Sequence, residues 1–460
     1  MKFPRCALVI ALAAASAALV PGCGQRQALP AAPPAEQEPD VVPIGPIRHV
    51  VLVVQENRTF NDFFATFPGG GGTTTGKVGV VARCHIYKEK TIALTKSDLA
   101  TSRDMNHSYQ GFLKARNRGA MDEFDAVPYQ NGDPECRQPY QYTNPAQIAP
   151  YWDMARQYAL AARMFTTQGS SSFTAHQDLI AGGTVVAPNE ALINSPSCSG
   201  AKCVWGCDAP PNTRTQLITA TDQYLGGKGP FPCLSYQTLR DLLDARRVSW
   251  KYYVPPMCCN TFGKLMSAFD AIKAVRNSKE WDTNVVSPQT QILTDIANGA
   301  LPAMSWVIPD EGDSDHPGNN SDRGPSWVAS VVNAVGESRY WKTSVVIVLW
   351  DDWGGLYDNL SPPHKNYGGL GFRVPAIVVS PYAKKGYVSL TPYEFGSVLK
   401  YIEGNWRLGS LHTTDKRSTS IIDCLDYSQK PIVFKPIAAK YSAEYFLHKS
   451  PSYLPVDTDL

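Results

Sequence analysis

The feature that most constrains the fold is an uninterrupted apolar run that ends abruptly in polar side chains. Val50–Val54 is a run of five aliphatic residues, and Gln55, Glu56 and Asn57 follow it directly. A run without alternation is typical of a strand buried on both faces, as in a parallel sheet covered by helices. Ligands bind such sheets just beyond the carboxyl ends of the strands. The sequence therefore predicts an α/β fold with Glu56 and Asn57 at a site, although a buried strand followed by an ordinary polar turn gives the same pattern.

A second apolar run, far along the chain, repeats this design. Val345–Leu349 is aliphatic, and Trp350 is followed by Asp351 and Asp352 and then by a glycine turn. Two adjacent carboxylates repel each other unless a cation lies nearby, and hard divalent cations prefer oxygen ligands. Two such junctions are less readily explained as accidental turns than one. We therefore expect Glu56, Asp351 and Asp352 to converge.

A hydroxyl-rich segment, Ser170–His176, precedes a predicted helix that ends at Gly182. A serine at the amino end of a helix faces unpaired backbone N–H groups and the positive end of the helix dipole. That position favours an alkoxide and binds phosphate oxygens, so the segment is suited to attack on phosphorus. The three serines could equally serve only as helix caps.

Together these segments resemble the bacterial phosphoesterase family that contains phosphatidylcholine-type phospholipases C and related acid phosphatases. Glu56–Phe60 reads ENRTF and is similar to the family's ENR-[ST]-F signature. The resemblance runs from about Ile47 to about Leu408. It implies an alkaline-phosphatase-like three-layer α/β sandwich with a central, mostly parallel sheet, and hydrolysis of phosphate esters. The other matching segments are Asp104–Ser108, Gln168–Gln177, Pro309–Pro317 and Trp350–Asp352.

The resemblance also implies a role for individual residues. Ser172 takes the position of the nucleophile, counted back from His176, and would form a phosphoserine intermediate. One extra residue after Gly169 and two missing prolines leave Ser171 as a second candidate. His176 adjoins this segment and could line the pocket, although some members of the family carry a different residue there. One divalent metal ion, of unknown identity, would be bound by Glu56, Asn57, Asp351, Asp352 and the Ser172 hydroxyl.

Two histidines complete the predicted site. His107 and His316 match positions where the family has histidines near the phosphate, so they would stabilise phosphoryl oxygens and assist departure of the leaving group. His316 lies in an acidic loop that begins at Asp310. The loop resembles a calcium loop in composition but not in spacing, and four acids on a solvated turn are the simpler interpretation.

The start of the chain predicts export. Met1–Cys23 has a short basic start and an apolar core that is too short to span a membrane comfortably. A small residue before Cys23 resembles a bacterial lipobox, although Pro21 is unusual there. We expect a lipid anchor on Cys23 in the periplasm or cell envelope, with ordinary cleavage and secretion as the alternative. Residues 24–46 are rich in Ala and Pro and predict a flexible linker, so the phosphoesterase domain would span residues 47–460.

Cysteine usage predicts an insertion. Of the eleven cysteines, two belong to the export segment, and six of the other nine lie between Cys198 and Cys259. An oxidising compartment favours disulfides. We therefore expect an insertion over about residues 186–262, stapled by disulfides and roofing the site. A zinc site is the weaker alternative, because no histidine accompanies these cysteines.

Local patterns predict further elements. Asn144 is expected to cap one helix, Ser235 to cap another, and Thr391–Glu394 reads as a capping box. Three more apolar segments are predicted to be strands: Ser249–Val254, Met304–Ile308 and Val374–Val379.

Composition limits the partners. A net charge of +2 with 18% charged residues gives no reason to expect nucleic acid. The expected substrate is a phosphate ester, with phospholipids among the candidates. The chain reaches Leu460 without the carboxyl-terminal modules of many phospholipases C in the family, which favours a broad phosphomonoesterase or phosphodiesterase. The alternative function is a non-catalytic, lipid-anchored binding module on the same fold.

Overall fold

The structure, a computed structural model of the chain, describes residues 41–79, 84, 90–101, 103–129, 132–197, 204–257 and 266–452. The predicted export segment, Met1–Cys23, and most of the predicted linker lie outside these residues. Four of the cysteines discussed above also lie outside them: Cys198, Cys203, Cys258 and Cys259. All described residues belong to one unit, Glu38–Leu460. None of the helices described in it is both long enough and apolar enough to cross a membrane.

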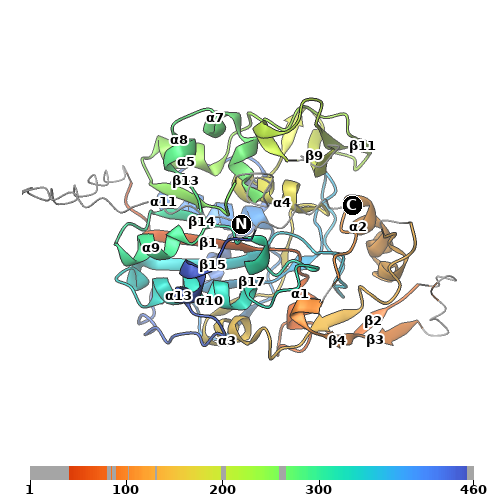
Figure 1. Ribbon diagram of the computed structural model, residues 1–460, viewed down its shortest axis with the longest axis horizontal. Helices are drawn as coiled ribbons and strands as arrows, with labels where there is room; N and C mark the ends of the chain where they lie inside the picture. The colour runs from red at the N-terminus through yellow and green to blue at the C-terminus, as the bar shows by residue number, and fades with distance from the viewer. Residues whose placement is uncertain are drawn as a thin grey trace, which may run out of the picture. The chain divides into compact units, whose positions relative to one another are not determined.

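An eight-stranded sheet forms the centre of the fold, in the order β13-β12-β14-β1-β15-β17-β6-β18 (Figure 1). The first five of these strands are parallel to one another, whereas β17 runs antiparallel to both of its neighbours. The prediction of a mostly parallel sheet in an α/β fold is therefore confirmed. The strands are β1 (His49–Gln55), β6 (Ala159–Ala161), β12 (Trp250–Tyr253), β13 (Val285–Val286), β14 (Met304–Val307), β15 (Ser344–Trp350), β17 (Ala376–Val379) and β18 (Tyr387–Ser389).

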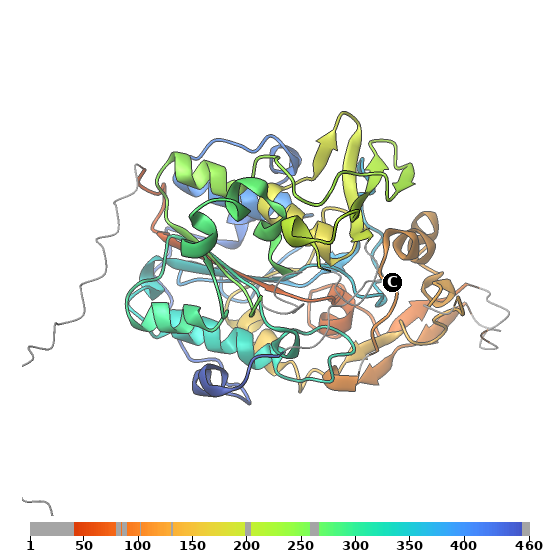
Figure 2. The same cartoon turned by 45° about the horizontal axis from the view of Figure 1, so that its top comes forward.

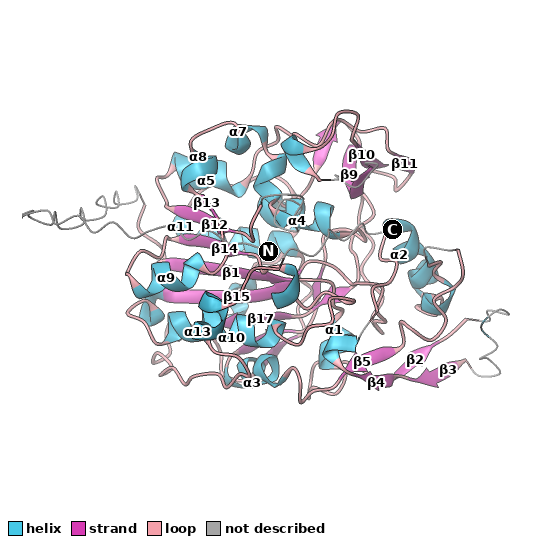
Figure 3. Ribbon diagram, in the orientation of Figure 1, coloured by secondary structure: helices cyan, strands magenta, loops and turns pink. Residues whose placement is uncertain are grey.

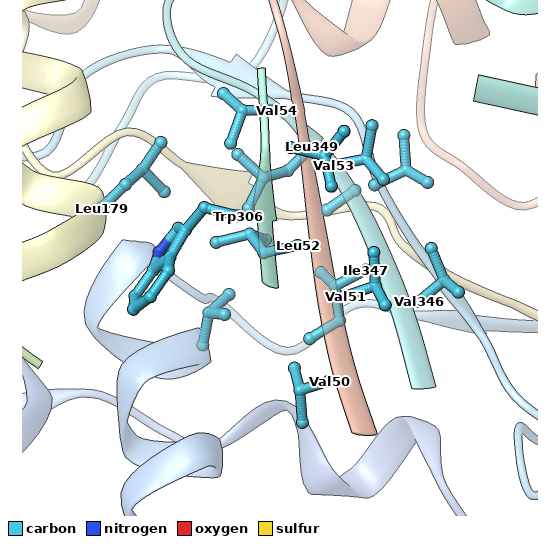
Figure 4. Packing of buried hydrophobic residues seen from close by; sticks show 14 of the residues in the cluster. Val50, Val51, Leu52, Val53, Val54, Leu179, Trp306, Val346, Ile347 and Leu349 are labelled. Carbon is cyan, nitrogen blue, oxygen red and sulfur yellow. The ribbon is translucent and has the colours of Figure 1, made fainter. Parts of the chain in front are cut away.

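The two apolar runs that dominate the sequence are neighbours at the middle of this sheet. β1 pairs in parallel with β15, and their last residues, Gln55 and Trp350, lie in register. Side chains of β1 pack among those of β15, Trp306 of β14 and Leu179 of α4 (Ser172–Ala181) (Figure 4). Strands with neighbours on both sides and helices on both faces expose no surface, which explains the absence of alternation in their sequences.

Helices cover both faces of the sheet (Figures 1 and 2). One layer contains α3 (Ala149–Gln157), α9 (Gln291–Ala297), α10 (Gly324–Gly336) and α13 (Ala443–His448), and the other contains α4 (Ser172–Ala181), α5 (Leu239–Ala245), α11 (Phe395–Trp406) and α12 (Thr414–Arg417). The predicted three-layer arrangement is confirmed. The other described α-helices are α1 (Phe60–Phe64), α2 (Tyr109–Arg116), α7 (Lys273–Arg276) and α8 (Glu280–Thr283).

A four-stranded antiparallel sheet occupies part of the range that we expected as an insertion (Figure 3). Its strands are β8 (Val185–Ala187), β9 (Glu190–Ser197), β10 (Arg214–Thr219) and β11 (Tyr224–Gly226). The later part of the expected range, 186–262, does not belong to this sheet, because α5 lies in a helix layer and β12 pairs with β14 in the central sheet. The sheet packs on the amino end of α4, where Asn194 of β9 bonds to Ser170 and Thr174.

Two disulfides lie in the described part of the chain. Cys207–Cys233 falls inside the expected insertion, whereas Cys84–Cys136 joins two segments outside it. Cys424 is buried and forms no disulfide with the described cysteines. Disulfides were expected, but the pair outside the insertion was not. Three small two-stranded sheets complete the fold: β2 (Thr75–Lys77) with β3 (Thr91–Ala93), β4 (Thr95–Ser97) with β5 (Gln141–Thr143), and β7 (Met164–Phe165) with β16 (Arg373–Val374).

Three predicted helix caps were wrong. α3 begins at Ala149 rather than beside Asn144. α5 is capped by Thr238 in a reciprocal arrangement with Asp241, not by Ser235. α11 uses a capping box of Glu394 and Ser397, so Thr391 precedes the helix without capping it. α3 has Ile148 at its cap position and no side-chain cap, whereas α5 and α11 are each capped by a neighbouring residue of the same segment.

The predicted strands are present, with one interruption. β12 and β14 lie within the predicted segments Ser249–Val254 and Met304–Ile308. The segment Val374–Val379 is divided between β16 and β17 at Pro375, because proline has no N–H to donate to a ladder.

Candidate active site and metal centre

The two strand-to-acid junctions meet at one point, as expected for the carboxyl ends of adjacent parallel strands. Asp351 Oδ1 accepts hydrogen bonds from the backbone N–H groups of Asn57, at 2.9 Å, and of Asp352, at 2.7 Å. The glycine turn has a steric reason. Gly354 has a φ of +56°, and a Cβ atom there would lie 2.1 Å from the carbonyl oxygen of Asn57. The junctions are thus locked together by backbone contacts.

Three side chains at this point are arranged like metal ligands. Ligand atoms of Glu56, His176 and Asp351 all lie within 4.8 Å of one another. Nε2 of His176 is 3.1 Å from Glu56 Oε1 and 3.7 Å from Asp351 Oδ2. The three side chains are buried. A nitrogen and two carboxylates converging at this spacing fit a divalent cation.

Unpartnered oxygens support the same conclusion. Glu56 Oε2, Asn57 Oδ1 and Asp351 Oδ2 are buried and have no hydrogen-bond partner among the described residues. Buried polar atoms without partners are costly and uncommon in folded proteins. Burial and the nearby charge of Asp351 raise the pKa of Glu56 well above its usual range. A cation would satisfy these oxygens and compensate their charge, so the residues fit the expected metal.

The three serines at the amino end of α4 differ in what their hydroxyls contact. Ser172 Oγ donates to Asp352 Oδ2 at 3.0 Å. Ser171 Oγ instead lies 3.1 Å from the hydroxyl of Ser195, and Ser170 Oγ accepts from a backbone N–H of β9. Ser172 therefore places its hydroxyl on the acid cluster and at the start of a helix, whereas the other two face the four-stranded sheet.

Both predicted histidines border the cluster. The ring centroids of His107 and His316 are 6.3 Å apart. Nδ1 of His107 lies 2.7 Å from the carbonyl oxygen of Met105. A carbonyl only accepts, so Nδ1 carries the proton, and Nε2 accepts from the Asn57 amide at 3.1 Å. That hydrogen bond directs the amide nitrogen of Asn57 towards His107, so the amide oxygen Oδ1 points away from His107.

His316 is held by its own loop. Its Nδ1 donates to the carbonyl oxygen of Pro317 at 2.6 Å, and Nε2 is the other ring nitrogen that can carry a proton. The simpler interpretation of its acidic loop as a solvated turn is wrong: Asp310, Asp313 and Asp315 are buried.

The structure thus brings the predicted residues into one buried cluster and adds one. The sequence suggested His176 only as a residue that could line the pocket, whereas its ring lies against Glu56 and Asp351. The available signal was helical spacing: residues four apart lie on one face of a helix, and His176 is four residues after Ser172.

Carboxylates follow two adjacent parallel strands, and a serine at the start of α4 and nearby histidines lie beside them. This arrangement is typical of a class of protein, the ester hydrolases. Comparison with known proteins gives the particular group. The chain belongs to the Phosphoesterase family, which matches residues 47–409. It is a hydrolase acting on phosphoric ester bonds, as the sequence motifs predicted. Membership of an enzyme family takes support away from the alternative of a non-catalytic binding module.

Similar curated proteins are bacterial phospholipases C. Phospholipase C B of Mycobacterium tuberculosis is 23% identical over 432 residues, which cover 82% of this chain and 76% of that protein. Phospholipase C A of the same species is 25% identical, over 78% of this chain and 73% of that protein. Hemolytic phospholipase C of Pseudomonas aeruginosa is 24% identical, over 80% of this chain and 54% of that protein.

A comparison with solved structures found a protein in the alkaline phosphatase superfamily from Vibrio parahaemolyticus. The match has a TM-score of 0.38 and 9% sequence identity, and it covers 84% of this chain and 74% of that one.

Proposed function

We propose that the protein is an exported, metal-dependent phosphoesterase of the acid-phosphatase or phospholipase C type that works through a phosphoserine on Ser172. The observation that carries this proposal is the group of unpartnered buried oxygens of Glu56, Asn57 and Asp351 beside the Ser172–Asp352 hydrogen bond. A hydroxyl that adjoins a cation site is suited to become a nucleophile near neutral pH.

Glu56, Asn57 and Asp351, which carry the unpartnered oxygens, would hold the metal. Asp352 and the Ser172 hydroxyl would complete the ligand set. His176 adds a nitrogen donor that the sequence did not predict as a ligand. Oxygen ligands alone suit Mg²⁺, Ca²⁺ or Mn²⁺, and an imidazole nitrogen extends the choice to Zn²⁺. When bound, the cation supplies Lewis-acid stabilisation of the serine alkoxide and of the charge on the phosphoryl group.

The chain's own residues would carry the proton and bond changes. Ser172 Oγ forms the bond to phosphorus while Asp352 Oδ2 accepts its proton, and the bond from phosphorus to the leaving oxygen breaks. His316, as the imidazolium with its Nδ1–H on the Pro317 carbonyl, gives its Nε2 proton to that oxygen. Backbone N–H groups of the first turn of α4 stabilise the phosphoryl oxygens. Water then attacks the phosphoserine and gives a proton back to His316, the phosphorylated product leaves, and Asp352 returns its proton to Ser172.

The substrate proposal rests on the relatives. Phospholipases C hydrolyse phosphodiesters, so we propose a phosphate ester with a small alcohol or lipid on the departing side. Phosphatidylcholine, p-nitrophenylphosphorylcholine and p-nitrophenyl phosphate separate lipid, diester and monoester activity. Turnover of the monoester alone would favour the phosphatase type, and turnover of phosphatidylcholine the phospholipase C type.

The decisive experiment combines these substrates with chelation and two serine variants. Purified protein is assayed as isolated, after chelation, and after restoration with each divalent metal in turn. We expect activity to disappear on chelation, to return with at least one metal, and to be lost in Ser172→Ala but retained in Ser171→Ala. Normal turnover by Ser172→Ala would refute the assigned nucleophile, and chelator-resistant turnover would refute metal dependence.

Export and anchoring form a separate part of the proposal. The apolar start of the chain and the lipobox-like residues before Cys23 support transfer across a membrane and lipid attachment. Expression of the full chain and of Cys23→Ser in a bacterial host with a labelled fatty acid tests this. Label and membrane association should be present in the first and lost in the second. Unlabelled protein in both would contradict lipidation while leaving the enzyme proposal intact.

A further inference from the structure

The segment Ser442–Ser452, which we term the latch, reaches the acidic loop from outside the active site. Its helix α13 lies beside α10 on one face of the sheet (Figures 1 and 2). Phe446 anchors it there, buried against Trp327 with ring centroids 5.4 Å apart. After the helix the chain turns towards the loop Asp310–His316, which we term the His316 loop.

Lys449 of the latch enters a pocket of acids in that loop. Its Nζ is 2.6 Å from Asp310 Oδ2 and 2.9 Å from Asp313 Oδ2, and its side chain is only 10% exposed. The backbone N–H of Ser452 also donates to Asp310 Oδ2, at 3.1 Å. Burial would lower the pKa of Lys449, but the charges of Asp310 and Asp313 outweigh it and raise the pKa above its usual value. The lysine therefore stays charged.

The same two acids shape the loop. Asp310 Oδ1 accepts from the backbone N–H of Asp313 at 3.0 Å and so closes the turn that leads to His316. Arg323 donates to the other oxygen of Asp313, at 3.0 Å. Without Lys449 the buried carboxylates of Asp310 and Asp313 would face each other with one cation fewer. Repulsion between two carboxylates at such a short distance is relieved when one of them binds a proton or when the loop moves.

The opposite side of the loop is fixed to β1. The Gln55 side chain accepts from the Asp315 backbone N–H at 3.1 Å and donates to the Asp313 carbonyl. Arg58 Nε donates to the Asp315 carbonyl at 2.6 Å. Arg58, the remaining charged residue of the ENRTF motif, thus supports the residue that precedes His316 rather than binding at the metal centre. His316 is held between a rigid strand and the latch.

We propose that Lys449 is a positioning residue for the hydrolytic reaction: by holding Asp310 and Asp313, it sets His316 in line with the departing oxygen of the substrate. The inference rests on the proposed function, because it requires His316 to protonate the leaving group. It assigns a reaction role to a residue far along the chain that touches neither the metal ligands nor the nucleophile.

The test compares Lys449→Met with a matched control on two esters. Lys440→Met removes a lysine from the same part of the chain, where Nζ is 2.6 Å from Asp322 but the side chain is 63% exposed. The esters are p-nitrophenyl phosphate, whose leaving group departs without help, and phenyl phosphate, whose leaving group needs a proton. We expect Lys449→Met to lower kcat for phenyl phosphate about tenfold, part of the hundredfold or more that a positioned acid contributes, with KM unchanged. The kcat for p-nitrophenyl phosphate should change less than about threefold, because little protonation is needed.

A double variant separates positioning from general damage. In a His316→Ala background, Lys449→Met should add no further selective loss, because residues that act through one another are not additive. Lys440→Met should behave like the unaltered protein on both esters. Equal loss on both esters, no loss, or full additivity with His316→Ala would overturn the proposal.

Two controls keep the outcome interpretable. If Lys449→Met fails to fold, Lys449→Arg keeps the charge and changes only its geometry, and it should show the same selectivity at smaller size; equal effects on both esters would again overturn the proposal. Failure of the proposed function is seen separately, as full activity of Ser172→Ala or as a His316→Ala variant without leaving-group selectivity.

Discussion

Two groups of buried acids lie near each other in this molecule and are compensated in opposite ways. Asp310 and Asp313 receive Lys449 and Arg323 from the chain itself. Glu56 and Asp351 face the imidazole of His176 instead of a lysine or an arginine. Burying a charge is costly unless it is paired, so we propose that a cation completes the second group. The first group holds a loop in place, and the second is the proposed cation site.

The comparison also divides the ENRTF motif. Its acid and amide, Glu56 and Asn57, lie in the cation site, whereas Arg58 bonds to Asp62 and to the His316 loop. A single short motif therefore contributes to both groups: Glu56 and Asn57 offer oxygens to the proposed cation site, and Arg58 donates a hydrogen bond to the His316 loop.

The largest effect should come from neutralising one acid of the cation site. Asp351→Asn removes a ligand and a charge, so kcat/KM should fall on the order of a thousandfold, the several kcal/mol that a metal contributes. Stability should respond in the opposite direction, because the neutral side chain no longer repels Glu56. Steady-state kinetics and thermal unfolding of the metal-free variant measure the two effects. If metal-free Asp351→Asn were less stable than the metal-free parent, the acids of the cation site would not differ from Asp310 and Asp313 in the way described.

Neutralising the other group should destabilise the protein. Asp310→Ala leaves the largely buried Lys449 without one of its partners and removes the cap of the turn at Asp313, at a cost of about 3 kcal/mol. Urea denaturation measures it, and Asp322→Ala, which breaks the exposed pair with Lys440, is the control and should cost less than about 1 kcal/mol. Equal costs would show that burial of the first pair has no consequence.

Metal should stabilise the parent protein by mass action. At a free concentration one hundred times Kd, a ligand that binds only the folded state adds about 2.7 kcal/mol. We expect thermal unfolding to shift upwards with added divalent cation in the parent and in Asp310→Asn, but not in Asp351→Asn. A shift in Asp351→Asn of the same size as in the parent would place the binding site elsewhere.

The smallest effect concerns pH. Burial raises the pKa of Asp315 to about 7, although Tyr151 and Trp350 donate to it. The folded state therefore binds a proton more tightly than the unfolded chain, and this contribution to stability is complete below about pH 4 and is lost as pH rises through about 7. Between pH 5 and 7 the loss amounts to about 2 kcal/mol. The difference in urea stability between the parent and Asp315→Asn should change by that amount, and a flat difference would rule out the raised pKa.

Contiguous patterns made much of the fold and site predictable. The aliphatic runs of β1 and β15 identify buried parallel strands, and the acids that follow them must meet because adjacent parallel strands end at one edge. The helix from Ser172 to the turn at Gly182 could also be predicted, since a serine start and a glycine end bound it on both sides.

Contacts between distant segments could not be read from the sequence in the same way. Lys449 and His176 look like an ordinary lysine and an ordinary helical histidine until folding places them against buried carboxylates. Cys84 and Cys136 are 52 residues apart in the sequence, and no cysteine motif marks them as a pair. Two helix caps failed for a local reason, because the neighbouring Thr238 and Glu394 could accept the same backbone N–H groups.

Calorimetric titration of chelated protein with divalent metal ions tests the central contrast most directly. The account predicts about one ion bound per chain in the parent and in Asp310→Asn, with binding abolished in Asp351→Asn. Absence of binding in the parent, or binding that survives Asp351→Asn but is lost in Asp310→Asn, would contradict it.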